Sequence, residues 1–221
     1  MAGKFITFEG GEGAGKSTQA ALLAKRLSLA GISVLLTREP GGSPGAEIIR
    51  HVLLSGAARR FGAGAETLLF AAARADHLDT VITPALRSGQ WVICDRFIDS
   101  TRVYQGIVGK VDLPFIRGLE RLTVGAFMPD LTFILDLPAE TGLARAKARR
   151  GDDDPDRFET EDLASHQALN AGFRAIAAEE KQRCMLIDAH RPAEQVADEI
   201  WRAVLRRLDP AKASSAVEET A

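Results

Sequence analysis

The chain has 221 residues with a formal net charge of −2, and 46% of them are hydrophobic, which is typical of a soluble globular protein of one domain. The balanced charge argues against a non-specific nucleic-acid binder, because such a protein would carry a basic excess. No apolar run approaches the ~18 residues of a membrane-spanning helix, so we expect neither nucleic acid nor membrane as a partner.

Five short apolar runs rich in Val, Ile, Leu and Phe are predicted to be buried strands, and they alternate with stretches of helical spacing. This alternation is typical of a parallel sheet covered by helices on both faces, which makes the fold class α/β. Ligands of such folds bind at the C-terminal ends of the strands. The predicted strands are residues 4–9, 33–38, 90–95, 130–137 and 184–188, and the predicted helices are 17–30, 46–54, 66–88, 113–127, 140–150, 162–180 and 193–208.

Residues 1–208 are predicted to form a single domain, with a small lid at about residues 145–160. Residues 151–156 are an acidic, polar break between two helices and are a candidate mobile loop. Residues 209–221 are small and polar without apolar periodicity, so we expect a disordered tail.

Two features favour a cytoplasmic location. The first residues lead into a short apolar run that ends at Glu9, without a signal-peptide pattern. Cys94 and Cys184 lie far apart, each within an apolar run, as expected for reduced cysteines of a protein core.

Arginine is unusually frequent, at 21 of the 28 basic residues. Its planar fork suits phosphates and carboxylates, so a phosphate-handling protein is one interpretation. The other is GC-rich coding, because the chain also contains 35 alanines. Composition alone favours the second interpretation, and only the positions of individual arginines can decide.

The strand at residues 4–9 runs directly into a phosphate-binding motif, G-x-x-x-x-G-K-[ST], which is followed by a helix. Its glycines let successive N–H groups point into one concavity, and the helix N-terminus adds partial positive charge. Lys16 is expected to reach the β- and γ-phosphates, and the Ser17 hydroxyl to bind Mg²⁺. The predicted ATP-binding residues here are Gly10, Gly11, Gly13, Ala14, Gly15, Lys16, Ser17 and Thr18.

Asp95 and Arg96 end the predicted strand at residues 90–95. An aspartate at this end of a central strand suits water-mediated Mg²⁺ binding, although a helix cap or a surface ion pair would also explain it. Arg96 can bind a phosphate with both arms of its guanidinium. The sequence contains no N-K-x-D or T-K-x-D stretch, which disfavours a GTP-dependent switch.

Three motifs taken together resemble bacterial thymidylate kinase: the phosphate loop, Arg38-Glu39-Pro40-Gly41-Gly42, and Asp95-Arg96 followed by Ser100-Thr101 and Tyr104-Gln105-Gly106. The resemblance extends to about Leu208. It implies a P-loop kinase with a five-stranded parallel sheet and a small lid, which phosphorylates dTMP to dTDP with ATP and Mg²⁺ in dTTP synthesis. It also implies a homodimer.

The resemblance assigns the dTMP site residue by residue. Phe70 would stack on thymine, Arg74 would bind a base carbonyl, and Tyr104 would pack under the deoxyribose. Without the resemblance, we would expect Phe70 to be a core residue and Arg74 a solvated charge. The two residues are four positions apart, which places them on one face of the predicted helix. Arg96 would bind the dTMP phosphate, with Arg50 as a second candidate. The other implied dTMP contacts are Glu12, Glu39, Pro40, Ser100, Thr101 and Gln105.

The family differs in where its catalytic arginine lies. Position 12 holds Glu, so this chain resembles the kind that carries the arginine on the lid and uses Glu12 near the 3′-hydroxyl. Arg149 is the best match for that arginine, although Arg150 leaves the register uncertain by one residue. Arg145 matches the residue that packs on adenine, near a loop at residues 188–194, and Phe158-Glu159 resembles a motif at the lid's end. Lys16, Arg96, Arg149 and Glu12 are therefore the predicted catalytic residues.

Two alternatives stay open: another nucleoside monophosphate kinase, and a P-loop ATPase that acts as a switch. The four histidines show no metal-ligand spacing and are expected at the surface; they are His51, His77, His166 and His190. About five arginines occupy predicted contact positions, whereas others, such as Arg59, Arg60, Arg206 and Arg207, are expected on helix ends and polar faces.

Overall fold

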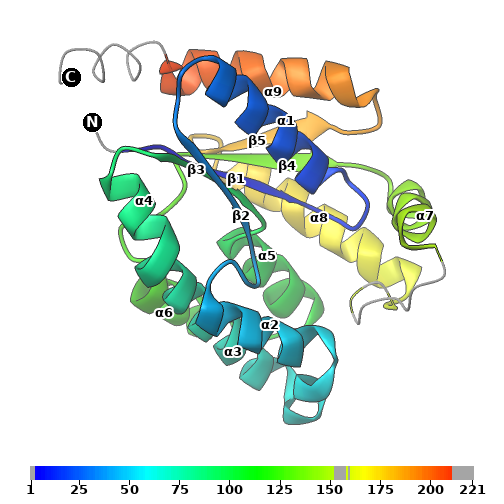
Figure 1. The fold of residues 1–221 in the computed structure, drawn as a ribbon. Coiled ribbons are helices and arrows are strands. Elements are labelled where there is room, and N and C mark those ends of the chain that lie inside the picture. The colour runs from blue at the N-terminus through cyan, green and yellow to red at the C-terminus, as the bar shows by residue number, and fades with distance from the viewer. Residues whose placement is uncertain (1–2, 152–157, 159, 211–221) are drawn as a thin grey trace.

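The computed structural model describes residues 3–151, 158 and 160–210. Its centre is a parallel sheet in the order β2-β3-β1-β4-β5, which Figure 1 shows between layers of helices. The strands are β1 (Phe5–Gly10), β2 (Val34–Arg38), β3 (Trp91–Asp95), β4 (Leu131–Asp136) and β5 (Cys184–Asp188). All five lie within one residue of the predicted runs, and the predicted α/β class with a five-stranded parallel sheet is confirmed.

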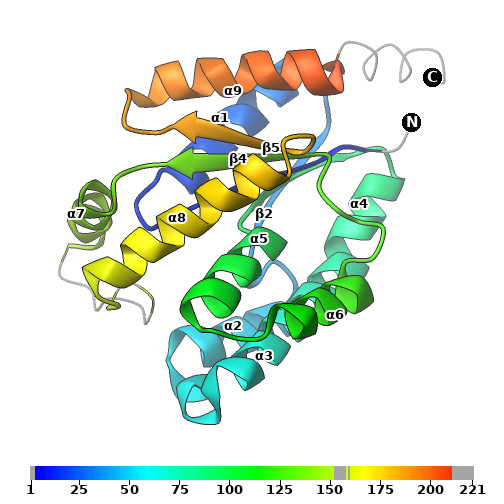
Figure 2. The same ribbon diagram turned by 180° about the vertical axis from the view of Figure 1, so that it is seen from behind.

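Helices cover both faces of the sheet. On one face α1 and α9 pack over β1 and β4 with an apolar core that includes Leu23, Phe133 and Ile200. On the other face α4, α5 and α8 lie against the sheet, as Figure 2 shows from behind. The helices are α1 (Lys16–Leu29), α2 (Pro44–Leu54), α3 (Gly62–His77), α4 (Thr83–Arg87), α5 (Ile98–Thr101), α6 (Leu113–Thr123), α7 (Ala139–Arg150), α8 (Leu163–Glu179) and α9 (Ala193–Leu208), with shorter turns η1 (Ala57–Phe61), η2 (Leu78–Ile82) and η3 (Arg102–Val108).

Two stretches differ from the predicted helices. The helix predicted over residues 66–88 begins earlier and is divided into α3, a π-helical turn η2 and α4. Pro84 lies in the first turn of α4 and has no N–H to donate, so the regular hydrogen-bond ladder is interrupted there. Residues 98–108 were not predicted to be helical, yet α5 and η3 occupy them because this segment packs onto α8 and α3.

The prediction that all four histidines lie at the surface is wrong for two of them. His51 and His190 are exposed, whereas His77 and His166 are buried. His77 ends α3 and has one hydrogen-bond partner near the end of β2 and one on the loop that follows it, and His166 lies on the inner side of α8. In a helix that has apolar and polar residues on several sides, the sequence does not show which way one polar residue faces. Spacing therefore could not distinguish the two buried histidines from the two exposed ones.

The predicted mobile loop and tail fall mostly outside the described residues. Gly151 ends α7 with a positive φ of 65°, and residues 152–157 and 159 are not described. Of the predicted tail only Asp209 and Pro210 are described. In the described part of the chain, no helix is both long and apolar enough to span a bilayer.

Candidate active site

A cavity of about 430 Å³ lies at the C-terminal ends of β1, β2 and β3. This is where a doubly wound sheet binds its ligands. Both predicted subsites contribute to its lining: the phosphate loop from one side, and α3, α5 and η3 from the other. The predicted site residues that line it are Glu12, Gly13, Gly15, Lys16, Ser17, Thr18, Glu39, Pro40, Arg50, Phe70, Arg74, Asp95, Arg96, Ser100, Thr101, Tyr104, Gln105 and Arg149.

Four predicted residues lie behind or beside this lining. Gly10 and Gly11 offer their carbonyl oxygens to the ammonium of the P-loop lysine, and Ala14 is buried in the core. Arg145 donates through Nη1 to the carbonyl of Ala189, at 3.3 Å, in the loop that follows β5. Lining residues outside the predicted set are Arg38, Leu54, Phe97 and Phe158.

Lys16 is held inside the phosphate loop. Its Nζ donates to the carbonyls of Gly10 and Gly11 at 3.1 and 2.7 Å, and burial followed by the charge of Arg96 lowers its pKa to about 8. The loop passes close to α7: a Cβ on Gly13, which has a φ of +65°, would lie 2.0 Å from the carbonyl oxygen of Gly142. Glycine is therefore required there both by conformation and by space.

Ser17 and Asp95 form an oxygen-rich pair at the floor of the cavity. The Ser17 hydroxyl donates to Asp95 Oδ2 at 2.5 Å, and Asp95 Oδ1 is buried without a hydrogen-bond partner among the described residues. A hydroxyl beside a carboxylate with an unused oxygen is a donor set that suits Mg²⁺, which typically takes one or two protein ligands together with phosphates and water. The two residues therefore fit the ion expected there.

Arg96, Glu12 and Tyr104 form a compact cluster beside the phosphate loop. Arg96 Nη2 donates to Glu12 Oε1 at 2.5 Å, the Tyr104 hydroxyl donates to the same oxygen at 2.9 Å, and the guanidinium lies over the Tyr104 ring. Burial opposes ionisation of Glu12, but the charges of Arg96 and Lys16 outweigh it and lower the pKa to about 2. An anionic substrate group here would meet a guanidinium already desolvated and oriented.

The opposite wall carries the aromatic and polar residues predicted for a base. The Phe70 ring lies 6.2 Å from that of Phe158, and both residues line the cavity. Arg74 is buried and donates through Nη2 to Thr101 Oγ1 at 3.0 Å. Arg50 is oriented by donating through Nη1 to the carbonyl of Pro40 at 2.5 Å.

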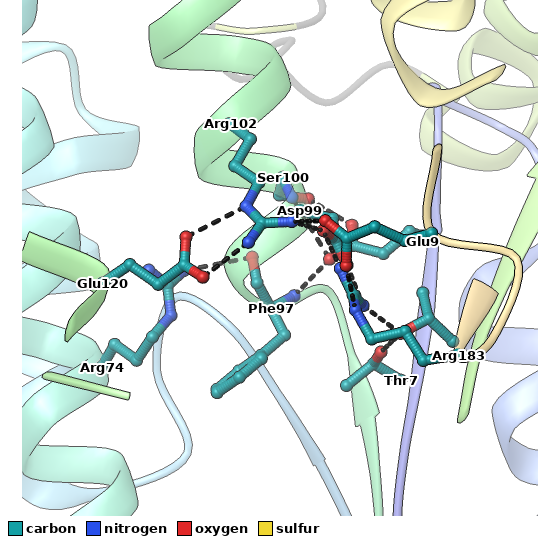
Figure 3. A network of polar contacts seen from close by, with 11 residues as sticks. Thr7, Glu9, Arg74, Phe97, Asp99, Ser100, Arg102, Glu120 and Arg183 are labelled. Carbon is teal, nitrogen blue, oxygen red and sulfur yellow. Dashed lines mark hydrogen bonds and ion pairs between the residues drawn. The ribbon is translucent and has the colours of Figure 1, made fainter. Parts of the chain in front are cut away.

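The sequence analysis missed a buried ionic network beneath this wall, shown in Figure 3. Glu9 accepts from the Phe97 and Ser100 amides at 2.8 and 3.2 Å and from the Ser100 hydroxyl at 2.6 Å. Asp99 is paired with both outer nitrogens of Arg183, at 2.8 and 2.7 Å. One signal was present in the sequence, because Glu9 is a charged residue at the end of an otherwise apolar strand.

Comparison with known proteins places these motifs in one family. The family model described as "Thymidylate kinase" matches residues 8–200. A thymidylate kinase of Rhodopseudomonas palustris (strain ATCC BAA-98 / CGA009) is 59% identical over 217 residues, which cover 97% of this chain and 94% of the relative. One from Bradyrhizobium sp. (strain ORS 278) is 59% identical over 213 residues, covering 96% and 94%. A crystal structure of thymidylate kinase from Ehrlichia chaffeensis is 33% identical with a TM-score of 0.76, covering 92% of this chain and all of the other.

Proposed function

Because the chain belongs to the thymidylate kinase family, we propose that it phosphorylates dTMP to dTDP with Mg·ATP and so serves dTTP synthesis. The observation that carries this proposal is the shared cavity: a phosphate loop and a base-binding wall line the same space. Two substrates bound there would meet end to end, with the phosphate of the acceptor beside the transferred group.

The transfer needs no protein nucleophile and no general base, because an oxygen of the dTMP phosphate is already nucleophilic. Catalysis is then positioning and charge neutralisation. Lys16 binds the β- and γ-phosphates, and Arg96 leaves Glu12 in part to bind the acceptor phosphate, with Arg50 as its neighbour. Mg²⁺ held by Ser17 and Asp95 supplies further charge neutralisation at the ATP phosphates when bound.

The acceptor base lies against Phe70, with Arg74, Ser100, Thr101 and Gln105 as its polar wall. Tyr104 packs under the deoxyribose. Burial raises the pKa of Tyr104 well above its ordinary value, so the hydroxyl stays protonated and keeps donating to Glu12. In this position its ring would clash with a 2′-hydroxyl, which would favour deoxyribose.

Arg149 is the catalytic arginine of the lid, and Arg145 packs on adenine. In support, Arg149 lines the cavity from α7, and the hydrogen bond from Arg145 joins α7 to the loop that begins at Ala189. Closure of the lid over ATP brings one more positive charge to the transferred group and excludes water, which would otherwise accept the phosphoryl group. An arginine in this role contributes a factor of ~10³ or more to the rate, by analogy with arginine fingers.

The protein acts as a homodimer in the cytoplasm. Exposed apolar side chains on α2, α3 and α6, which pack against one another, and on the η1 turn support an interface there, because a contiguous apolar patch marks an interaction site. They are Ile48, Phe61, Leu68 and Leu122, which are between 49% and 84% exposed. Light scattering should give about twice the chain mass of 23.8 kDa. A mass equal to that of one chain would refute the dimer.

The acceptor is tested by measuring ADP release with dTMP, dUMP, CMP and GMP side by side. We expect dTMP to have the highest kcat/KM, and to raise the melting temperature most in a thermal-shift panel. Faster turnover of CMP or GMP would indicate another nucleoside monophosphate kinase. ADP release that does not depend on any acceptor would indicate an ATPase switch.

A further inference from the structure

A continuous line of buried polar contacts runs from the end of β2 to the base-binding wall. Thr37 Oγ1 lies 2.8 Å from His77 Nε2, and His77 Nδ1 lies 3.3 Å from Glu39 Oε1. Arg74 Nε donates to Glu39 Oε2 at 2.8 Å, and Arg74 Nη2 donates to Thr101 Oγ1 at 3.0 Å. His77, Glu39 and Arg74 are at most 6% exposed, so these contacts are largely shielded from bulk water.

The Glu39 end of this line has a defined donor and acceptor. A carboxylate only accepts, so His77 Nδ1 carries the hydrogen that faces Glu39, and Nε2 lies in hydrogen-bond contact with the Thr37 hydroxyl. Both Glu39 oxygens are then occupied, one by His77 and one by Arg74. The carboxylate is fixed at two points and cannot rotate toward the cavity.

This arrangement fixes the guanidinium as well. Nε of Arg74 is held by Glu39, and Nη2 is held by the Phe97 carbonyl at 3.1 Å and by Thr101. Nη1 donates to no residue in the described part of the chain, although Arg74 lines the cavity. A guanidinium nitrogen only donates, so it can bind a carbonyl oxygen of a base but not an amino group.

The loop after β2 is built around the imidazole. A Cβ on Gly42 would lie 2.4 Å from His77 Nε2 and 2.5 Å from Thr37 Oγ1, so the backbone of this loop closes directly over their contact. Asp76, the residue before His77, holds the end of the same loop and the first turn of α2 by accepting from the Ser43 hydroxyl at 2.6 Å and from the Ala46 amide at 3.1 Å. The end of α3 therefore has two tasks: Asp76 holds the loop, and His77 faces Glu39.

We propose that His77, held by Thr37, is a positioning residue that determines base specificity: it fixes the Glu39 carboxylate and thereby aims the unused N–H pair of Arg74 at a base carbonyl. The inference rests on the proposed function, since it assigns the residue behind the base contact of the dTMP site. His77 touches no substrate. It acts only through Glu39 and Arg74.

Two substitutions of His77 separate its two contacts. In His77→Asn the side-chain amide nitrogen takes the place of Nδ1 and keeps the donor to Glu39. In His77→Gln the longer amide reaches the place of Nε2, keeps a partner for Thr37 and leaves Glu39 without its second donor. His51→Gln, at an exposed histidine of α2, is the matched control.

The readouts are the KM for each substrate, kcat, and the ratio of kcat/KM for dTMP to that for dCMP, whose base carries an amino group in place of a carbonyl. We expect His77→Gln to raise KM for dTMP and to lower the ratio, each by about tenfold, because a misplaced donor loses orientation. The KM for ATP and kcat should be unchanged. His77→Asn and His51→Gln should behave like the wild type.

An unchanged dTMP-to-dCMP ratio in a folded His77→Gln would overturn the proposal, and so would equal rises in both KM values, which are the mark of a merely structural role. If His77→Gln does not fold, His77→Leu decides. It removes both contacts of the imidazole, including the donor to Glu39, and it must lower the ratio for the proposal to stand. A wild-type protein that does not turn over dTMP would instead refute the proposed function itself.

Discussion

Glu9 provides the sharpest test of the energetics inferred for the site. Its carboxylate is fully buried at the end of β1 and accepts three hydrogen bonds from the turn that carries Arg96. Burial, together with the negative charge of Asp99, raises its pKa from 4.5 to about 7. The substitution Glu9→Gln removes the titration but keeps the contacts, because the amide oxygen can accept from both backbone amides and the amide nitrogen can donate to the Ser100 hydroxyl.

The sign and size of the effect follow from linkage. Below pH 4.5 the carboxyl is protonated in both states, and between pH 4.5 and about pH 7 the unfolded chain releases a proton that the folded chain keeps. The stability contributed by Glu9 is therefore fully present below pH 4.5 and is lost as the pH rises through 7. One pKa unit corresponds to about 1.4 kcal/mol, so the change between pH 4 and pH 8 amounts to about 3 kcal/mol.

The assay is urea unfolding of the wild type and of Glu9→Gln at matched pH values from 4 to 8, followed by the fluorescence of Trp91 and Trp201, which both pack in the core on one face of the sheet. The difference in unfolding free energy, wild type minus variant, should fall by about 3 kcal/mol over this range. Glu179→Gln, at an exposed carboxylate of α8, controls for the loss of a charge as such. A difference that stays constant from pH 4 to pH 8 would refute the reasoning, because Glu9 would then titrate alike in both states.

Three further substitutions test the phosphate loop and the lid. Lys16→Ala should abolish turnover with an unchanged circular dichroism spectrum, and near-normal kcat would contradict its assignment to the phosphates. In steady-state kinetics, Arg149→Ala should lower kcat by a factor of ~10³, with smaller changes in the KM for either substrate. If Arg150→Ala shows this loss instead, the catalytic arginine of the lid is Arg150. Gly13→Ala should lower the free energy of unfolding by about 2 kcal/mol or more, because the added Cβ meets Gly142 in a strained conformation; chemical denaturation measures this, and an unchanged midpoint would contradict it.

The sheet could be predicted from the sequence because its signal is local. Each strand is a short apolar run, and the central strands β1, β3 and β4 are almost entirely inaccessible to water, whereas the edge strands β2 and β5 are partly exposed. The helix ends could not be predicted equally well. The π-helical turn η2 and the helical segment at residues 98–108 depend on packing against distant elements. Their own sequences show no hydrophobic periodicity that would predict them.

The same distinction applies to the site. The phosphate loop is contiguous in sequence, and the Asp95-Arg96 pair lies at the end of a strand. The positions of both in the site could therefore be predicted from the sequence. The line from His77 to Glu39 joins residues 38 positions apart, and neither residue shows in isolation that it faces the other. A histidine on a helix gives no indication of its partners until the loop after β2 is folded onto α3.

The arginine excess is explained by position in the fold rather than by composition. Few of the arginines are candidates for substrate binding or catalysis. Arg102 and Arg183 have another role, because they form ion pairs inside the protein. Arg183 spans the Asp99 carboxylate with two nitrogens and donates through Nε to Glu180 at 2.6 Å. Arg102 does the same with Glu120, through Nε at 3.0 Å and Nη2 at 2.5 Å.

A lysine could not make either contact, because its ammonium is a point charge without a planar fork. Arg102 Nη1 also donates to Asp99 Oδ1 at 3.1 Å, so both arginines compensate the buried charge of Asp99, which lies three residues after Arg96 and is inaccessible to water. Without them that carboxylate would lie unpaired beside Glu9, and the cost of a lone buried charge is several kcal/mol. The turn that presents Arg96 to the cavity is therefore stabilised by arginines that never reach the substrate.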